Sequence, residues 1–306
     1  MTRSPNAMPR TTGRRRAVAL ALTVAAVGAG AAALPTGALA SSGHPNADSR
    51  LVGTWVNANS ASRNVKQIVI APSRDAGGIT VDMFGSCSPT LCEWGRAPAI
   101  VYGPSVSSTT GKSFQVDINQ GFARRVDFGK LTVSATGAEK LTVREHNMYT
   151  DGSGRHDWVA TETFVPAGAA ATSSDATTAT DYPAGLQVGP NPALTGTWNN
   201  VNPGTNSITH LVISNAADGS LLVHQYGKCS PTDCDNGTVG AISYGKDISS
   251  TTGNSFLAPY TFGFADMQLV ATYSPSTHIL TVVEYTQFLD ASGRSNYTVT
   301  ERFAQS

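Results

Sequence analysis

The sequence predicts an all-β protein built from two tandem antiparallel β-barrels, and two observations carry this prediction. Most of the chain consists of an internal sequence repeat, which indicates one domain of about 110 residues in two copies rather than one large fold. Within each copy apolar and polar residues alternate with a period of two, and Gly, Asn, Asp and Ser interrupt the alternation every 8–15 residues. No helical periodicity appears after residue 40.

The repeat is defined by short motifs that return at a nearly constant spacing. The offset between the copies is 143 residues at the first motif, 142 through the middle and 139 at the end, which indicates a duplication followed by small insertions and deletions. The motif pairs are Gly53-Thr54-Trp55 with Gly196-Thr197-Trp198, Cys87-Ser88-Pro89-Thr90 with Cys229-Ser230-Pro231-Thr232, Ser108-Thr109-Thr110-Gly111 with Ser250-Thr251-Thr252-Gly253, and Ser153-Gly154-Arg155 with Ser292-Gly293-Arg294.

The first 40 residues have the features of an export signal. A basic Arg14-Arg15-Arg16 run precedes an apolar stretch, and Ala38-Leu39-Ala40 has the small residues of a cleavage site. We expect cleavage there and a secreted protein, exported by either the general or the twin-arginine route. The expected order is a signal peptide at 1–40, a polar lead at 41–50, repeat 1 at 51–165, a linker at 166–193 and repeat 2 at 194–306.

The linker and the strand count complete the predicted architecture. Residues 166–193 are rich in Ala, Thr, Ser and Pro, so this segment has too little apolar surface to fold alone and is expected to be flexible. About eight strands fit into each copy, and closure into a barrel would leave no exposed sheet edge. A two-layer sandwich is the alternative.

Charge and composition limit the classes of partner. Without the five arginines of the signal, 16 basic and 21 acidic residues remain, and no Lys or Arg cluster follows Arg16. Nucleic-acid binding is therefore not expected, because it needs clustered cations to neutralise phosphates. We also expect no membrane attachment after cleavage, a monomeric state and no cofactor. The six histidines form no pair at metal-ligand spacing, although His210 and His224 could meet across adjacent strands.

All four cysteines lie in the repeats, as one pair in each copy whose partners are five positions apart. In an exported chain this pattern predicts disulfides within the copies, Cys87–Cys92 and Cys229–Cys234. Closing so short a loop gains little entropy, so each bridge mainly fixes a local turn. Metal binding is the alternative, and it would need two further ligands beside each pair.

The last predicted hairpin of each copy carries the sharpest candidate site. Alternation along the strands places Glu145 and Glu162 on the apolar, inward face, and a hairpin centred between Ser153 and Gly154 sets them directly opposite each other. The same reasoning pairs Glu284 with Glu301 in the second copy.

Opposed carboxylates need an arginine, a shared proton or a cation between them. Arg155 and Arg294 in the hairpin turns are the nearest cations present in both copies. We expect each arginine to close one barrel end together with the glutamates, near Trp55 or Trp198. A ligand or ion site is an alternative. Catalysis is another, because carboxylates roughly 5–5.5 Å apart suit retaining glycoside hydrolysis.

The disulfide loop of the first copy is the second candidate site. Glu93, Trp94 and Arg96 lie at or just after the bridge, and an aromatic ring with charges on a rigid tip suits recognition of a sugar or a protein. The alternative is that Trp94 caps the core. The second copy has Asn236 in place of Trp94.

Two resemblances follow from these motifs. Gly53-Thr54-Trp55-Val56-Asn57 resembles the first strand of the avidin and lipocalin (calycin) barrels, which implies a calycin-like barrel with the tryptophan plugging one end. The whole repeat resembles a domain of secreted bacterial proteins with a Trp-x-Asn opening, a Cys-x-Pro-Thr-x-Cys-x-Trp-Gly loop and a Ser-Gly-Arg turn; this domain brings no established activity. Avidin-type biotin pockets use several tryptophans, whereas the second copy has only Trp198.

The sequence leaves three functional hypotheses. The first is a secreted, non-catalytic binding protein with two barrel modules, whose target is carbohydrate, cell-wall material or another protein and whose linked copies gain from effective concentration. The second is a secreted glycoside-type hydrolase using Glu145, Glu162, Glu284 and Glu301. The third is a protease inhibitor acting through the disulfide loop. No nucleophile elbow, phosphate loop, dinucleotide fingerprint or His-Glu-x-x-His motif appears, which favours binding.

Overall fold

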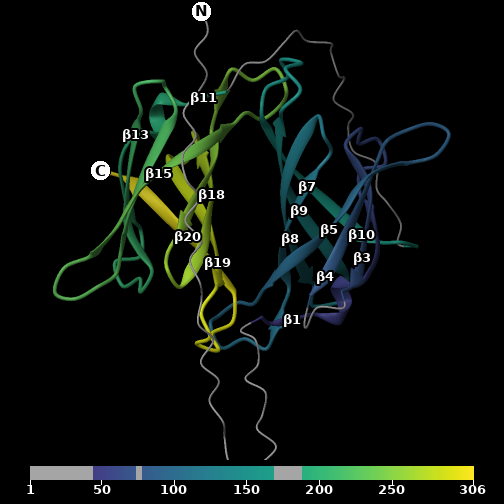
Figure 1. The fold of residues 1–306 in the computed structure, drawn as a ribbon, viewed down its shortest axis with the longest axis horizontal. Helices are drawn as coiled ribbons and strands as arrows, with labels where there is room; N and C mark the ends of the chain where they lie inside the picture. Colours follow the sequence, from purple (N-terminus) through teal and green to yellow (C-terminus); the bar gives the residue numbers. More distant parts are fainter. Residues whose placement is uncertain (1–43, 74–77, 169–187) are drawn as a thin grey trace, which may run out of the picture. The chain divides into compact units, whose positions relative to one another are not determined.

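The regular secondary structure of the described residues is almost entirely β-strand. The computed structural model describes residues 44–73, 78–168 and 188–306. They form two closed antiparallel barrels of eight strands each, which confirms the predicted fold class (Figure 1). The predicted signal peptide and most of the predicted linker lie outside the described residues. None of the described residues forms a helix long and apolar enough to cross a membrane.

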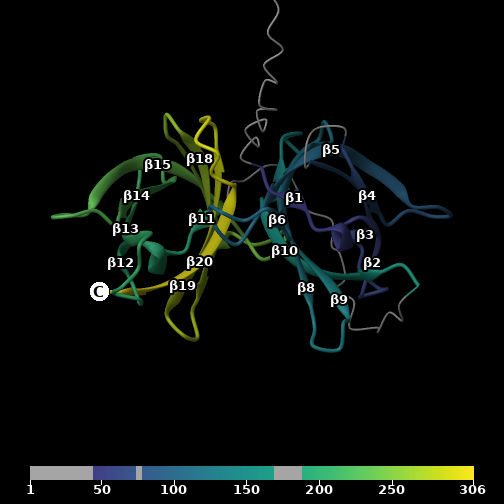
Figure 2. The same ribbon diagram turned by 90° about the horizontal axis from the view of Figure 1, so that it is seen from below.

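The first barrel is a meander in which each strand pairs with the next and the last pairs with the first. Closure occurs where Phe164 lies opposite Asn57, and Figure 2 shows the strands as a ring. The strands are β2 (Gly53–Asn57), β3 (Val65–Pro72), β4 (Ile79–Gly85), β5 (Cys92–Tyr102), β7 (Ser113–Asn119), β8 (Ala123–Val133), β9 (Glu139–Tyr149) and β10 (Trp158–Pro166).

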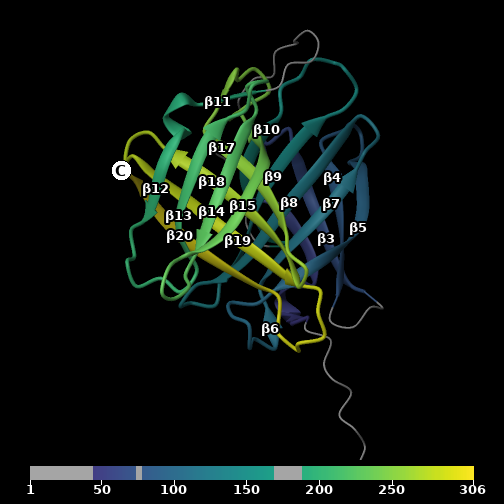
Figure 3. The same cartoon turned by 60° about the vertical axis from the view of Figure 1, so that its left-hand side comes forward.

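The second barrel repeats this order and closes where Phe303 lies opposite Asn200. Figure 3 shows its strands crossing the view obliquely, as strands of a closed barrel must tilt. They are β12 (Gly196–Asn200), β13 (Ile208–Asn215), β14 (Leu221–Gly227), β15 (Cys234–Tyr244), β17 (Ser255–Thr261), β18 (Ala265–Ser274), β19 (Ile279–Phe288) and β20 (Tyr297–Gln305).

Short elements precede each barrel, within the predicted lead and at the end of the predicted linker. In the first copy they are β1 (Asn46–Ala47), which pairs with β6 (Thr110–Gly111), and the 3-10 helix η1 (Ser49–Leu51). The second copy has β11 (Gly189–Pro190), which pairs with β16 (Thr252–Gly253), and η2 (Pro192–Leu194). Both segments are therefore part of the barrel structure.

The two opening tryptophans are fastened to these 3-10 helices. The indole Nε1 of Trp55 donates to the carbonyl of Leu51 at 2.9 Å, and that of Trp198 donates to Leu194 at 2.8 Å. Glycine precedes each Thr-Trp pair because Gly53 adopts a φ of +144°, which side chains with a Cβ rarely reach. The tryptophan of each Gly-x-Trp motif is thus buried in its barrel and bonded to the short helix that precedes it.

The space enclosed by each barrel is filled by apolar side chains. In the first barrel Trp55, Ile68, Met83, Phe114 and Phe164 are at most 2% exposed and belong to one cluster. The second barrel has the corresponding cluster, with Trp198, Leu211, Val223, Phe256 and Phe303. Small barrels of this strand number are commonly filled in this way.

The outer faces of the two barrels meet through a shared apolar cluster that includes Tyr102, Phe128, Tyr244, Val270 and Tyr285. Tyr102 and Tyr285 come from different copies, and their rings meet edge to face at 5.1 Å between centroids. The described parts of the two copies are therefore in contact, rather than the separate modules that the sequence suggests.

The backbone contacts between the copies are related by a pseudo-two-fold exchange. Gly103 N donates to Asn296 O at 2.9 Å, and Thr298 N donates to Gly103 O at 2.9 Å. The equivalent bonds, with the copies exchanged, run from Gly245 N to Asp157 O at 3.0 Å and from Val159 N to Gly245 O at 2.9 Å. Each copy thus contacts the other through equivalent backbone groups, as the two subunits of a symmetric dimer do.

Candidate functional site

One end of each barrel gathers four of its loops, including the disulfide loop and the turn of the last hairpin. Because successive strands alternate in direction, the connections after β2, β4, β7 and β9 all lie at the same end, which we call the barrel mouth. In the first copy the mouth is formed by residues 58–64, 86–91, 120–122 and 150–157. The helix η1 precedes β2 and therefore lies at the opposite end of this strand, and the indole of Trp55 bonds to that helix, so the predicted closure of the glutamate end by this tryptophan is wrong.

The predicted register of the last hairpin is wrong by two residues. Glu145 lies opposite Ala160, and Glu162 lies opposite Val143, so the two glutamates are diagonal neighbours. The shift arises because the amide of Tyr149 donates to the Asp157 side chain rather than continuing the strand ladder. An even shift keeps both glutamates on the predicted inward face. The second copy shows the same shift, with Glu284 opposite Val299 and Glu301 opposite Val282.

The glutamates hold the first loop of the barrel across the mouth. In the first copy Ser62 Oγ donates to Glu162 Oε1 at 2.6 Å, and Asn64 Nδ2 donates to Glu145 Oε2. In the second copy Thr205 Oγ1 donates to Glu301 Oε1 at 2.6 Å, and Ser207 Oγ donates to Glu284 Oε2 at 2.9 Å. We call this arrangement the loop latch.

The cation that meets the glutamates of the first copy is Arg125 on β8, a residue that the sequence reasoning missed. Its side chain is 2% exposed, and its Nη2 lies 2.9 Å from Glu145 Oε2 and 3.3 Å from Asp127 Oδ2. Its guanidinium also lies over the ring of Trp94, 5.3 Å from the centroid. Arg125, Asp127, Glu145 and Glu162 form what we call the buried charge cluster.

Arg155 and Arg294 do not bridge the glutamates, so that prediction is wrong. Arg155 Nη2 pairs with Asp151 Oδ2 at 2.7 Å within its own turn, and its guanidinium stacks on Tyr149 at 4.0 Å. Arg294 repeats this arrangement with Asp290 at 2.8 Å and Phe288 at 4.0 Å. Both arginines remain at the rim of the mouth because the Asp-x-Ser-Gly-Arg turn supplies their partners.

Burial dominates the electrostatics of the buried charge cluster. It raises the pKa of Glu145 well above the usual range, and Arg125 opposes this rise only in part, while Glu162 and Asp127 add to it. Burial likewise raises the pKa of Asp127 to about 6 against the pull of Arg125. Glu145 Oε1 and Glu162 Oε2 are buried without any other partner. The first copy therefore meets its two glutamates with a buried arginine, which leaves one oxygen of each glutamate without a hydrogen bond.

The second copy holds its glutamates without any arginine. Glu284 is 1% exposed and accepts hydrogen bonds from Ser207, Thr286 and Tyr297. Burial raises the pKa of Glu284, and these hydroxyl groups oppose the rise. Met267 and Leu269 stand at the positions of Arg125 and Asp127.

Trp94 caps the core rather than standing on an exposed tip. Its ring covers Gly85 so closely that a Cβ on that glycine would lie 1.8 Å from the indole. It also packs against the apolar cluster of the first barrel. Glu93 and Arg96 beside it are exposed, and Arg96 pairs with Asp82 at 2.6 Å. In the second copy Asn236 approaches Gly227 in the same way.

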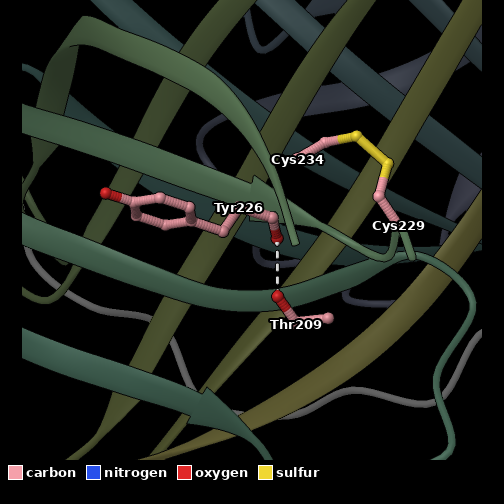
Figure 4. The surroundings of a disulfide bond; sticks show 4 residues. All are labelled: Thr209, Tyr226, Cys229 and Cys234. Carbon is pink, nitrogen blue, oxygen red and sulfur yellow. Dashed lines mark hydrogen bonds between the residues drawn. A yellow bond between two sulfur atoms is a disulfide. The ribbon is translucent and has the colours of Figure 1, made fainter. Parts of the chain in front are cut away.

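Both predicted disulfides are present, each within its own copy: Cys87–Cys92 and Cys229–Cys234. Figure 4 shows the second bridge beside Tyr226, whose carbonyl accepts a hydrogen bond from Thr209 Oγ1 at 3.1 Å. Each bridge closes the loop between two paired strands at the barrel mouth, which fits the predicted role of fixing a turn. Disulfides are typical of an oxidising compartment.

His210 and His224 do not meet. The ring of Tyr226 lies between them, with centroid distances of 4.1 Å and 4.5 Å and nearly parallel planes. His224 Nε2 lies 2.7 Å from Asp235 Oδ1, and Nδ1 lies 2.8 Å from the hydroxyl of Thr238. Within the described residues no group of three or more His, Cys, Asp or Glu side chains is arranged to hold a metal ion.

Comparison with known proteins identifies no family. No family model matches the chain, and no curated protein matches it. Among solved structures, the dehydratase domain from the terminal module of the rifamycin polyketide synthase is 10% identical over 82% of this chain and 98% of that chain, with a TM-score of 0.13. A score this low carries no argument about fold or function. The resemblances to calycin barrels and to the secreted bacterial domain stay predictions.

Proposed function

We propose that this chain is a secreted, non-catalytic binding protein that recognises an extended polysaccharide, such as cell-wall material, through the rims of its two barrel mouths. The observation that carries the proposal is an arginine held between aromatic rings at the rim of both copies. The first copy uses Arg155 with Tyr149 and Phe122, and the second uses Arg294 with Phe288 and Phe264.

The rim groups are exposed and held in place before any target arrives. Phe122 and Phe264 are 45% and 46% exposed, although both are large apolar residues. The arginine side chains are 31% and 38% exposed, and each is fixed by an aspartate and a serine of its own turn. Exposed aromatic rings and arginines are the residue types that dominate binding energy at interfaces, and fixing them in advance lowers the entropic cost of binding.

The glutamate pairs favour a structural role over hydrolysis. A catalytic carboxyl must reach the oxygen that it protonates. Glu145 is fully buried, Glu284 is 1% exposed, and the first loop of each barrel is bonded across both pairs. The filled barrel interiors also favour recognition on the outer surface. The protease-inhibitor hypothesis has no comparable observation in its favour and stays a prediction.

The proposal is tested by pull-down on insoluble cellulose, chitin and peptidoglycan. We expect the protein to be retained on at least one of them, and a double variant Phe122→Ser/Phe264→Ser to bind at least about tenfold more weakly, since hot-spot truncations commonly cost more than 1 kcal/mol each. Val52→Ser is the matched control, because Val52 is also apolar and 37% exposed but lies just before β2, away from the mouth. Absence of retention on all three polymers, or equal retention of the double variant, would contradict the proposal.

A further inference from the structure

A small polar cavity lies where the two barrels meet, beside the mouth of the second barrel, because its lining residues Thr261 and Asp266 flank the connection between β17 and β18. Its volume is about 190 Å³. The first barrel contributes residues of β5 and β7, and the second contributes residues of β17, β18 and β19. Its polar lining includes Tyr102, Gln115, Asp266, Gln268 and Gln287. Drug-sized ligands usually occupy cavities of about 300–1,000 Å³, so this one suits a single small molecule.

The pseudo-two-fold relation shows that the contact does not need these polar groups. The positions related to Gln115, Gln268 and Gln287 in the other copy are Leu257, Val126 and Met148. Leu257 and Val126 are 5% and 6% exposed, and all three pack in the shared apolar cluster. The same contact is thus closed with apolar side chains on one side and lined with amides on the other.

The polar groups of the cavity are only partly satisfied by the protein itself. Asp266 Oδ1 is buried without a hydrogen-bond partner. The Tyr102 hydroxyl donates to Gln115 Oε1 at 3.0 Å, so these two lining groups already satisfy each other in part. A buried acceptor without a partner costs free energy, so a ligand that donates to it is favoured.

The lining selects for an uncharged ligand rich in hydroxyl groups. No lysine or arginine lines the cavity, and the carboxylate of Asp266 disfavours anions. Amide side chains both donate and accept, as sugar hydroxyls do, and Asp266 accepts from hydroxyl groups. The rings of Tyr102 and Tyr285 add a buried aromatic wall.

We propose that this cavity between the barrels binds a neutral monosaccharide, or the terminal neutral sugar of a glycan. None of the rim residues Phe122, Arg155, Phe264 and Arg294 lines the cavity, so this proposal stands or falls separately from the function proposed above.

The test titrates the full mature protein with D-glucose, D-galactose and N-acetylglucosamine, by calorimetry and by chemical-shift changes. We expect at least one of them to bind at millimolar concentrations. Gln268→Val and Gln115→Leu place in the cavity the residues found at the related positions, so the contact between the barrels should persist. Each variant is expected to weaken binding about tenfold, the equivalent of one lost hydrogen bond to a buried group.

Three comparisons make the result decisive. Gln305→Leu removes an exposed amide on β20 and should bind like the wild type. Val52→Ser, at an exposed residue that does not line the cavity, should also bind the sugar normally. If Gln268→Val fails to fold, Gln287→Met replaces it. Failure of all three sugars to bind, or unchanged binding in the folded cavity variants, would overturn the inference.

Discussion

The two barrels hold the same pair of inward glutamates by different means. In the first, the guanidinium of Arg125 meets Glu145 and Asp127 under the ring of Trp94. In the second, neutral hydroxyl groups surround Glu284. Both copies nevertheless keep a loop hydroxyl on the second glutamate, Ser62 on Glu162 in one and Thr205 on Glu301 in the other. The comparison identifies the loop latch as the shared feature and the buried charges as a replaceable way to support it.

The largest effect is expected from Arg125→Met, which copies Met267 of the second barrel. It leaves three inward carboxylates without their cation, and breaking a buried ion pair in this way typically costs about 3–5 kcal/mol. Urea unfolding monitored by fluorescence measures the loss. Arg125→Met/Asp127→Leu, which copies both positions of the second barrel, should recover a large part of it. A loss in the single variant below 1 kcal/mol would show that the cluster is already neutralised in another way.

A smaller effect is expected from Glu284→Gln in the second barrel. The amide keeps one oxygen acceptor but gives up charge-assisted bonds from the hydroxyls of Ser207, Thr286 and Tyr297. We expect a loss of about 1–2 kcal/mol in the free energy of unfolding. The equivalent Glu145→Gln in the first barrel should cost more, because it removes the partner of Arg125. Equal losses in the two variants would contradict the distinction between the barrels.

The pH dependence of stability should also differ between the barrels. The pKa of Asp127 rises from 3.8 to about 6 on folding, so the native state holds this proton more tightly than the unfolded chain. Its contribution to stability is therefore greatest below about pH 4 and is lost as the pH rises to about 6. Asp127→Asn removes this titrating group. The difference in the free energy of unfolding between the wild type and this variant should therefore change between about pH 4 and pH 6, and it should favour the wild type most at low pH. Leu269 offers the second barrel no such group.

The smallest effects concern the loop latch itself. Ser62→Ala and Thr205→Val each remove one hydroxyl bonded to a glutamate, at an expected cost of about 1 kcal/mol. The backbone amides of Asn64 and Ser207 lose their hydrogen-bond acceptors in these variants, because they donate to these same hydroxyl oxygens. Hydrogen exchange should become faster at Asn64 in the first variant and at Ser207 in the second. Unchanged exchange at both amides would mean that other contacts hold the loop.

The sequence was sufficient for the barrels because their signals are local and repeated. The period-two alternation fixed which face of each strand points inward, and the cysteine spacing fixed the disulfides. The register of the last hairpin was not accessible in this way, since it depends on the side chain of Asp157 replacing a backbone acceptor. The predicted inward face of the glutamates is nevertheless correct, because a register shift of two residues leaves every side chain on the same face of the sheet.

The arginine of the first barrel was missed for a different reason. The presence of an arginine at the turn of the last hairpin in both copies, Arg155 and Arg294, favours these residues as partners of the glutamates, whereas Arg125 has Met267 as its counterpart. A usable signal was present, because alternation along β8 places Arg125 and Asp127 on the inward face between apolar neighbours. The contact between the barrels was not predictable, since its residues look like ordinary outward positions of each repeat.

The exchanged contacts of Gly103 and Gly245 have one further consequence. In a pair of separate identical chains, any substitution in such a contact is made twice, once on each side of the axis. Joining the halves in one polypeptide removes that constraint, so one side can gain glutamines while the other keeps leucine, valine and methionine. Covalent fusion thereby allows one asymmetric cavity to form at the contact, which two identical subunits related by a two-fold axis cannot form.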